Sequence, residues 1–342
     1  MVYLGLLIIA LGSFCQSSSY VPINKIKNWS WESFWLIQAV FAYFLLPWLG
    51  ALLAMPEGES LLSLYQNAPS FNLWMTIVFG MLWGIGGLTF GLSMRYLGVA
   101  LGQSIALGTT AGIGTIMGPI LLQAFFPESD ALSQLTGSVI IGVIVTLIGI
   151  NIIGVAGAMK SNAISDEQKK TSTKEFNFGK GIMIALLCGF MSGCFNVGLA
   201  FGQDIYVHGT SPMLQSLPAT FLVTLGGFLT NAVYCLAQNK KNKTFVDYKK
   251  GNVWANNLFF CILAGALWYS QFFGLSLGKG FLTDYPTLMT LSFCILMSLN
   301  VIFSNFWGMV LHEWKGCPPK TIAVLIVGII VLVISTFLPQ LI

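Results

Sequence analysis

The sequence has few charged residues: Asp, Glu, Lys and Arg make up 8% of its 342 residues, against 56% hydrophobic ones. Soluble domains carry about a quarter charged residues. This chain therefore lacks the charge to cover a surface in water, which excludes an ordinary set of soluble domains. Its mean hydropathy of +0.79 agrees with that exclusion.

Motifs for catalysis, metal binding and disulfide pairing are also missing. The sequence has only two histidines, far apart, and it has no HExxH, GxSxG or P-loop pattern. Its seven cysteines form no CxxC pair and lie mostly in apolar runs, which indicates buried thiols rather than a zinc site or a disulfide framework. We therefore expect no enzyme activity, no metal site and no cofactor.

Apolar sequence is abundant and falls into ten stretches. A helix needs about 20 apolar residues to cross a bilayer, and in lipid the backbone must satisfy its own hydrogen bonds, which favours helices. The sequence therefore predicts an all-α integral membrane protein with ten transmembrane helices. The expected spans are 2–21, 31–54, 71–93, 96–122, 134–156, 180–202, 214–238, 253–277, 285–311 and 320–341.

Basic residues lie almost entirely in alternate loops of this topology. Of the 16 lysines and arginines, only Lys279 falls in the other set of loops. By the positive-inside rule the lysine-rich side is cytoplasmic. Both termini are then expected outside, and the strict alternation supports the count of ten because a missed span would break it.

The longest polar segment divides the spans into two sets of five. We expect a first five-helix repeat at 1–156, a cytoplasmic linker at 157–179 and a second repeat at 180–342. An odd number of spans makes the halves insert in opposite orientations, as in the inverted repeats of secondary transporters. Weak internal similarity agrees, because GMLWGIGGLTFGLS (80–93) and GALWYSQFFGLS (265–276) share Gly-x-Leu-Trp and Phe-Gly-Leu-Ser.

A few amides and aromatic residues lie within the expected spans. Polar groups are costly in lipid, so these should point inward. One interpretation is hydrogen bonding between helices. The other is a cavity for a neutral polar solute such as a sugar, with aromatic faces to stack on it. For the second interpretation the substrate-binding candidates are Gln16, Trp83, Gln103, Asn196, Trp268, Tyr269 and Gln271.

Acidic residues are absent from the interiors of the expected spans, and a few, such as Glu32 and Asp284, lie at span ends. A carboxylate in a membrane cavity can carry a proton, so Asp284 is the first candidate for proton coupling and Glu32 the second. The alternative is a solvated carboxylate that favours a helix N-terminus electrostatically.

Six motifs follow one another along the chain: KIKNWSWESFW (25–35), LWGIGGLTFGLSMRYLG (82–98), GTIMGPI (114–120), CGFMSG (188–193), LWYSQFFG (267–274) and LHEW (311–314). Together they resemble the L-rhamnose–proton symporters of the drug/metabolite transporter superfamily. The resemblance implies two inverted five-helix repeats and uptake of L-rhamnose with protons across a bacterial inner membrane.

The partners expected for such a protein are a small sugar, protons and the lipid bilayer, with no nucleic acid and no obligate protein partner. The sugar would bind near the bilayer midplane between the repeats, and alternating access would move it across. A related deoxy-sugar or another small polar metabolite stays open as the substrate. Export of amino acids or other metabolites on the same fold also stays open, because a fold sets neither direction nor substrate.

Overall fold

The computed structural model describes residues 2–23, 25–97, 99–163, 178–208, 210–312 and 314–338. Within these ranges the chain is helical and contains no strand. Ten helical segments are long and apolar enough to cross a bilayer. They begin and end close to the expected bounds, which confirms the predicted all-α integral membrane protein.

The spans are formed by α1 (Val2–Ser18) with α2 (Tyr20–Ile23), by α3 (Trp31–Ala39), η1 (Val40–Leu45) and α4 (Leu46–Leu53) in succession, and by α6 (Ser70–Leu97), α7 (Val99–Phe125), α8 (Gly137–Ala163), α10 (Phe178–Phe201), α11 (Leu217–Asn242), α12 (Gly251–Lys279), α13 (Pro286–Val310) and α14 (Pro319–Phe337). Short helices lie in the connections: α5 (Leu61–Asn67), η2 (Pro127–Ser129), η3 (Ala131–Gln134), η4 (Gly202–Ile205) and η5 (Thr244–Lys249).

The chain forms two compact units, and each takes segments from both halves of the sequence. Unit 1 comprises Met1–Gly84 and Gly198–Thr283, and unit 2 comprises Ile85–Val197 and Asp284–Ile342. Helices α6 and α10 therefore contribute to both units. The division into repeats at 1–156 and 180–342 stays a prediction, and most of the expected linker at 157–179 lies outside the described residues.

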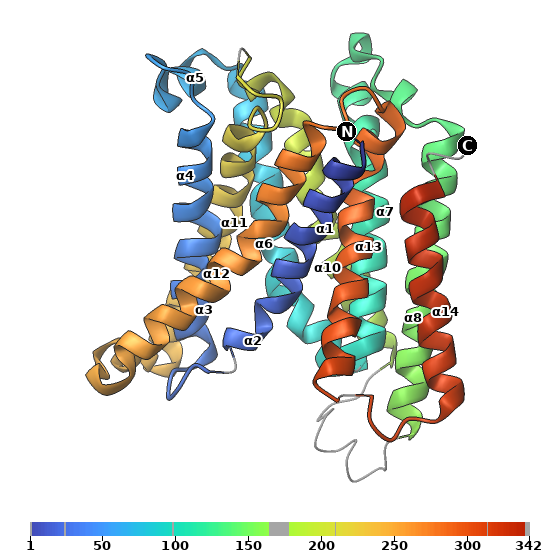
Figure 1. The fold of residues 1–342 in the computed structure, drawn as a ribbon. Coiled ribbons are helices and arrows are strands. Elements are labelled where there is room, and N and C mark those ends of the chain that lie inside the picture. The colour runs from blue at the N-terminus through green and yellow to red at the C-terminus, as the bar shows by residue number, and fades with distance from the viewer. Residues whose placement is uncertain are drawn as a thin grey trace. The chain divides into compact units, whose positions relative to one another are not determined.

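In unit 1, α1 packs along the oblique helix α12, and α11 packs against α3 and α4 (Figure 1). Glycines let backbones approach closely, as is common between helices in lipid. A Cβ atom at Gly80 of α6 would overlap the carbonyl group of Val223 on α11. A Cβ atom at Gly265 of α12 would lie 3.2 Å from the carbonyl oxygen of Gln38 on α3.

The second span departs from the uniform α-helix expected of it. Residues Val40–Leu45 form a turn of π-helix, in which the amide of Leu46 donates to the carbonyl of Phe41. A π-helical turn is rare and is frequent at functional sites, and it shifts the side chains beyond it around the helix axis. The apolar sequence VFAYFL does not predict this π-helical turn.

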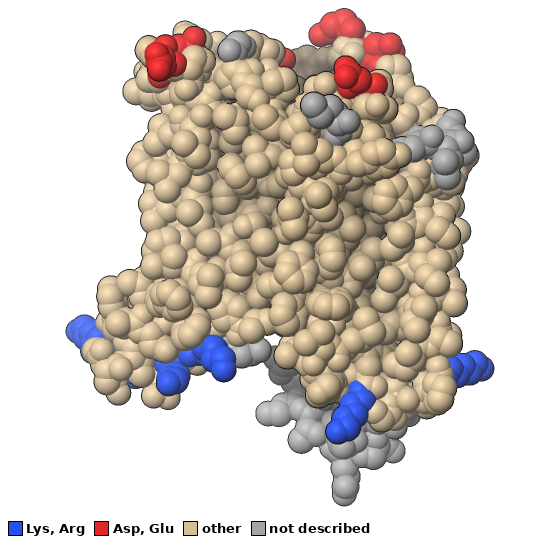
Figure 2. All heavy atoms as spheres, viewed as in Figure 1, with Lys and Arg blue, Asp and Glu red and all other residues tan. Residues whose placement is uncertain are grey.

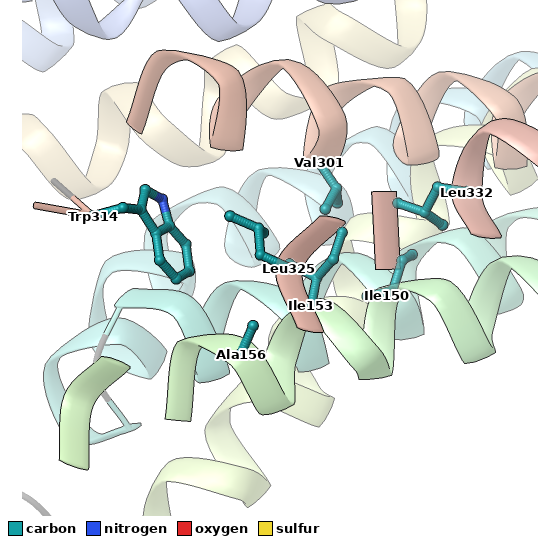
Figure 3. Packing of buried hydrophobic residues seen from close by; sticks show 7 residues of the cluster. All are labelled: Ile150, Ile153, Ala156, Val301, Trp314, Leu325 and Leu332. Carbon is teal, nitrogen blue, oxygen red and sulfur yellow. The ribbon is translucent and has the colours of Figure 1, made fainter. Parts of the chain in front are cut away.

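In unit 2, α8 packs along α14, and α7 packs against α8 and α13. Buried aliphatic side chains meet there (Figure 3). The cluster consists of Ile150, Ile153, Ala156, Val301, Trp314, Leu325 and Leu332. Trp314, the tryptophan of the LHEW motif, lies at one end of the cluster in Figure 3, and the ammonium group of Lys160 is 4.6 Å from its ring centroid.

The contact between α8 and α14 is reciprocal. A Cβ atom at Gly149 would lie 2.7 Å from Cδ2 of Leu332, and a Cβ atom at Gly328 would lie 2.6 Å from Cγ1 of Ile153. Each glycine therefore leaves the space that an aliphatic side chain of the other helix fills. Loss of that space would force side chains out of their rotamers or push the helices apart.

Candidate substrate site

Two of the predicted stacking residues lie together in unit 1. The ring centroids of Trp83 on α6 and Trp268 on α12 are 5.7 Å apart. Tyr43 of η1 lies 4.5 Å from Trp268 and 5.2 Å from Trp83, and Phe272 lies within 5.6 Å of both tryptophans. The rings are tilted or edge-on, which are favourable arrangements for aromatic pairs. We call these four residues the aromatic cluster.

Sequence reasoning missed Tyr43. It belongs to the π-helical turn, and only 4% of its surface is exposed. Trp83 is buried to a similar degree, with 7% exposed. Because Tyr43 sits in an unbroken apolar run, hydropathy and helical periodicity could not separate it from ordinary core residues.

Tyr269 comes directly after Trp268 but faces a different direction, since successive residues of a helix are turned by about 100°. Its hydroxyl group lies against Gly50 on α4, 2.7 Å from where a Cβ atom would be. This oxygen and Oε1 of Gln38 are buried with no hydrogen-bond partner among the described residues. A buried polar atom without a partner is costly, so a polar ligand or a water molecule at either place would be stabilising.

The two remaining candidates of unit 1 lie on α1 and α12, which pack together. Gln271 is buried, and its Nε2 donates to the carbonyl of Trp268 over 3.2 Å. Gln16 accepts a hydrogen bond of 3.4 Å from the hydroxyl of Ser17. Both of these hydrogen bonds lie within a single helix.

Unit 2 holds the other two amides. Nδ2 of Asn196 on α10 donates to the carbonyl oxygen of Gly114 on α7 over 2.6 Å. That bond joins two helices, as the first of the two interpretations expects. Gln103 belongs to α7, and its side chain lies outside the described part of the structure.

The two acidic candidates have opposite surroundings. Asp284 is exposed and comes directly before Tyr285, the N-cap residue of α13. Glu32 lies in the first turn of α3 and is only 7% exposed. Its Oε1 accepts hydrogen bonds from Nδ2 of Asn242 over 2.9 Å and from Oγ1 of Thr244 over 2.8 Å. Glu32 thus binds the end of α11 and the start of η5, and proton coupling by either acid stays a prediction.

A second buried acid, Asp247 of η5, was missed. Its carboxylate accepts hydrogen bonds from the amide of Ser30 over 2.8 Å, from Oγ of Ser33 over 3.0 Å and from Nζ of Lys250 over 2.6 Å. Burial by itself raises the pKa of Asp247, but these hydrogen bonds outweigh it and hold the pKa below the ordinary 3.8. Asp247 is therefore a fixed negative charge at neutral pH.

Glu32 and Asp247 are the centres of one hydrogen-bonded assembly, which we call the polar clamp. It joins the start of α3 to the connection between α11 and α12. Its members are Ser30, Glu32, Ser33, Asn239, Asn242, Thr244, Asp247 and Lys250. The WSWE motif thus has a structural role.

Across the described ranges, no group of three or more His, Cys, Asp or Glu side chains is placed to hold a metal ion.

Comparison with known proteins assigns the family. Residues 1–341 match the family model of the L-rhamnose-proton symport protein. The L-rhamnose-proton symporter of Yersinia pestis (strain Pestoides F) is 32% identical, over 98% of this chain and 96% of the relative. The L-rhamnose-proton symporter of Mannheimia succiniciproducens is 30% identical, again over 98% and 96%. This multi-pass membrane protein therefore belongs to the L-rhamnose-proton symport protein family, a family of transporters and not of enzymes.

Proposed function

We propose that the protein imports L-rhamnose together with protons across the bacterial inner membrane, by alternating access. The observation that carries the proposal is the family match over 1–341, with relatives of this name at 30% and 32% identity along almost the whole chain. A likeness that covers every span fits a shared transport cycle better than a shared scaffold alone.

The aromatic cluster is the proposed binding surface for the apolar side of the sugar. L-Rhamnose has a methyl group where most hexoses have a hydroxymethyl group, so it offers apolar carbon to Trp83, Trp268 and Tyr43. Aromatic walls with a few placed polar groups are typical of small-molecule sites. The buried hydroxyl of Tyr269 is the leading donor to a sugar hydroxyl. The amides of unit 1 proposed to complete the site are Gln16 and Gln271, and a role in substrate binding for Gln103 and Asn196 of unit 2 stays a prediction.

The inverted repeats are also part of the proposal, and helix packing supports them. Gly80 and Gly265 stand at matching places in the internal similarity, and they pack on the backbones of Val223 and Gln38. These two partners are as far apart in sequence as the two glycines are. Trp83 and Trp268, which come after the glycines at the same spacing, meet in the aromatic cluster.

Unit 2 gives independent support. Ile153 follows Gly149 on α8 at the same spacing as Leu332 follows Gly328 on α14. Each glycine contacts the aliphatic residue of the other helix. A twofold relation between the fifth and tenth spans produces such a reciprocal contact. The opposite orientation of the halves, with both termini outside, is inferred from the lysine distribution.

The test is uptake of labelled L-rhamnose by proteoliposomes under an imposed proton gradient, with other sugars as competitors. We expect accumulation that an uncoupler abolishes and that unlabelled L-rhamnose inhibits best. Accumulation of L-rhamnose in the absence of a proton gradient would overturn the symport proposal. So would a lack of accumulation with the gradient imposed in either direction. Better inhibition by another deoxy-sugar would change the substrate but keep the mechanism.

Asp284 is proposed as the proton-coupling group, with Glu32 second. Asp284→Asn cannot take up or release a proton, so it should abolish gradient-driven accumulation while exchange of labelled for unlabelled sugar continues. Glu128→Gln, which alters an exposed acid of η2 in the same unit, is the matched control and should transport normally. Normal accumulation by Asp284→Asn would move the role to another acid, and Glu32→Gln would be tested next.

A further inference from the structure

The connection between α11 and α12 exposes both lysines and apolar side chains. Phe245 and Val246 of η5 are 45% and 56% exposed. The lysines around them are exposed as well, and they are Lys240, Lys241, Lys243 and Lys249. Figure 2 shows basic side chains at the end of unit 1 where α12 begins in Figure 1, and acidic ones at the end where α5 lies.

The polar clamp fixes which way this segment faces. Asp247, the residue after Val246, is turned inward and bound by Ser30 and Ser33. Phe245 and Val246 therefore cannot reach the interior without breaking that assembly. Their exposure is a stable property of the fold, and in water it would be unfavourable by the apolar area left uncovered.

Among the described residues, acidic side chains balance only a small part of the positive charge of this segment. Lys250 forms an ion pair with Asp247, with 2.6 Å between Nζ and Oδ1. The other four lysines have no carboxylate within ion-pair distance in the part of the chain that the structure describes. Four positive charges beside two exposed apolar side chains match a ligand with an anionic head and an apolar tail.

Exposed tryptophans place the same end of unit 1 at the membrane surface. Trp31 is 43% exposed and Trp254 is 45% exposed. Trp31 stacks on Trp35, 5.2 Å between centroids, and meets Tyr234 of α11 edge-on. Tryptophan and tyrosine are enriched at the level of the lipid headgroups, so η5 begins and ends beside that layer.

We propose that this segment is a binding surface for anionic phospholipid headgroups. We call it the lysine surface, formed by Lys240, Lys241, Lys243, Phe245, Val246 and Lys249. The ammonium groups contact the headgroup phosphates, and Phe245 and Val246 lie against the first carbons of the acyl chains. Juxtamembrane basic segments are attracted to anionic lipid in this way, and the attraction weakens with salt. The inference is independent of the transported substrate.

The test is native mass spectrometry of the full chain in detergent, titrated with phosphatidylglycerol or with phosphatidylcholine. We expect wild-type protein to retain phosphatidylglycerol more tightly, with the preference falling as salt rises. The double variant Lys241→Gln/Lys249→Gln should bind phosphatidylglycerol roughly 30-fold more weakly, since each lysine near a membrane surface is worth about fivefold. Its phosphatidylcholine binding should be unchanged.

A matched double variant controls for loss of charge alone. Lys315→Gln/Lys320→Gln removes two exposed lysines of unit 2 and should leave phosphatidylglycerol binding as in the wild type. Equal losses in the two double variants, or equal retention of both lipids by the wild type, would overturn the proposal. Exposed lysines contribute little to folding, and equal thermal midpoints would verify that both variants are folded. Phe245→Ser should weaken the binding that remains at high salt, where charge is screened, and an unchanged affinity there would contradict the apolar contact.

Discussion

Pairs of glycines allow close helix contacts in both units. In unit 2 they lie between α8 and α14, and in unit 1 they lie where α6 meets α11 and where α12 meets α3. In unit 2, a glycine of each helix faces an aliphatic side chain of the other: Gly149 of α8 faces Leu332, and Gly328 of α14 faces Ile153. In unit 1 the glycines Gly80 and Gly265 also match, and so do the tryptophans three positions after them, but the residues beyond the tryptophans are not alike.

After Trp83 the first copy continues with Gly, Ile and Gly, whereas after Trp268 the second continues with Tyr, Ser and Gln. The π-helical turn likewise occurs in the second span, while α11, its proposed counterpart, is α-helical throughout. In the proposed repeat, the glycines at the helix contacts and the tryptophans after them match, and the three residues after each tryptophan differ. This difference fits the proposed site in unit 1, because an asymmetric ligand such as a sugar needs different contacts on its two sides.

The glycine contacts of unit 1 allow the strongest test of this comparison. Gly80→Ala would drive a methyl group into the Val223 carbonyl group, so we expect a loss of about 3 kcal/mol or more in the free energy of unfolding. Gly265→Ala meets its nearest atoms at 3.0 and 3.2 Å and should cost about 1 kcal/mol. The measurement is the thermal midpoint of the purified protein.

Gly87→Ala is the matched control on α6, because nothing lies within 4 Å of the added Cβ atom. It should be neutral or stabilising by up to about 1 kcal/mol, since alanine favours a helix more than glycine does. An ordering in which Gly87→Ala is as harmful as Gly80→Ala would show that the close approach of α6 to α11 is wrong.

The polar clamp has no counterpart among the contacts described in unit 2, and Asp247 is its charged centre. Asp247→Asn should lower the free energy of unfolding at neutral pH by about 1.5–3 kcal/mol, the range for hydrogen bonds to a charged group. The loss should be toward the lower end because the Lys250 side chain is 38% exposed. The folded-state pKa lies below 3.8, so the carboxylate contributes stability above its ordinary pKa and loses it as the pH falls through the folded pKa.

The difference in stability between wild type and Asp247→Asn should therefore be constant through neutral pH and close only below about pH 4. Asp130→Asn, in an exposed left-handed position that asparagine also tolerates, should show no such difference. A gap that closes near pH 6 instead would mean that Asp247 titrates in the working range and would make it a candidate proton carrier.

Two tyrosines of unit 1 separate binding from stability. Tyr269→Phe removes a buried hydroxyl without a described partner, so stability should be unchanged or slightly higher while the apparent affinity for L-rhamnose falls about three- to tenfold. Tyr65→Phe breaks a 3.0 Å hydrogen bond to the carbonyl of Pro218 and should cost about 1 kcal/mol of stability with affinity intact. Reversed outcomes would exclude Tyr269 from the site.

The spans could be predicted from the sequence because hydropathy and length govern insertion into lipid, and neither depends on which helix packs on which. The meeting of Trp83 with Trp268 was foreseeable in part, since both come after a glycine in the repeated letters. The position of Asn196 against Gly114 was not, because an amide that joins helices and one that binds a ligand have the same letter and the same spacing.

Tyr43 and Asp247 were missed for physical reasons. The π-helical turn η1 packs against α11 and α12, and its local sequence VFAYFL is equally suited to an α-helix. Asp247 lies among five lysines of the connection, where an acid normally indicates solvent. Its hydrogen bonds to Ser30 and Ser33, more than two hundred positions away in the sequence, hold it in the interior, and no local pattern predicts them.

Gradient-driven L-rhamnose uptake by Trp268→Leu proteoliposomes, normalised to folded protein, tests the central claim that the aromatic cluster is the sugar site of a symporter. Loss of the stacking surface should reduce uptake at least about tenfold, and Trp268→Phe should restore part of it. Trp74→Leu, which alters a tryptophan of α6 that is 66% exposed, should transport as the wild type does. Wild-type uptake by folded Trp268→Leu protein would contradict the account.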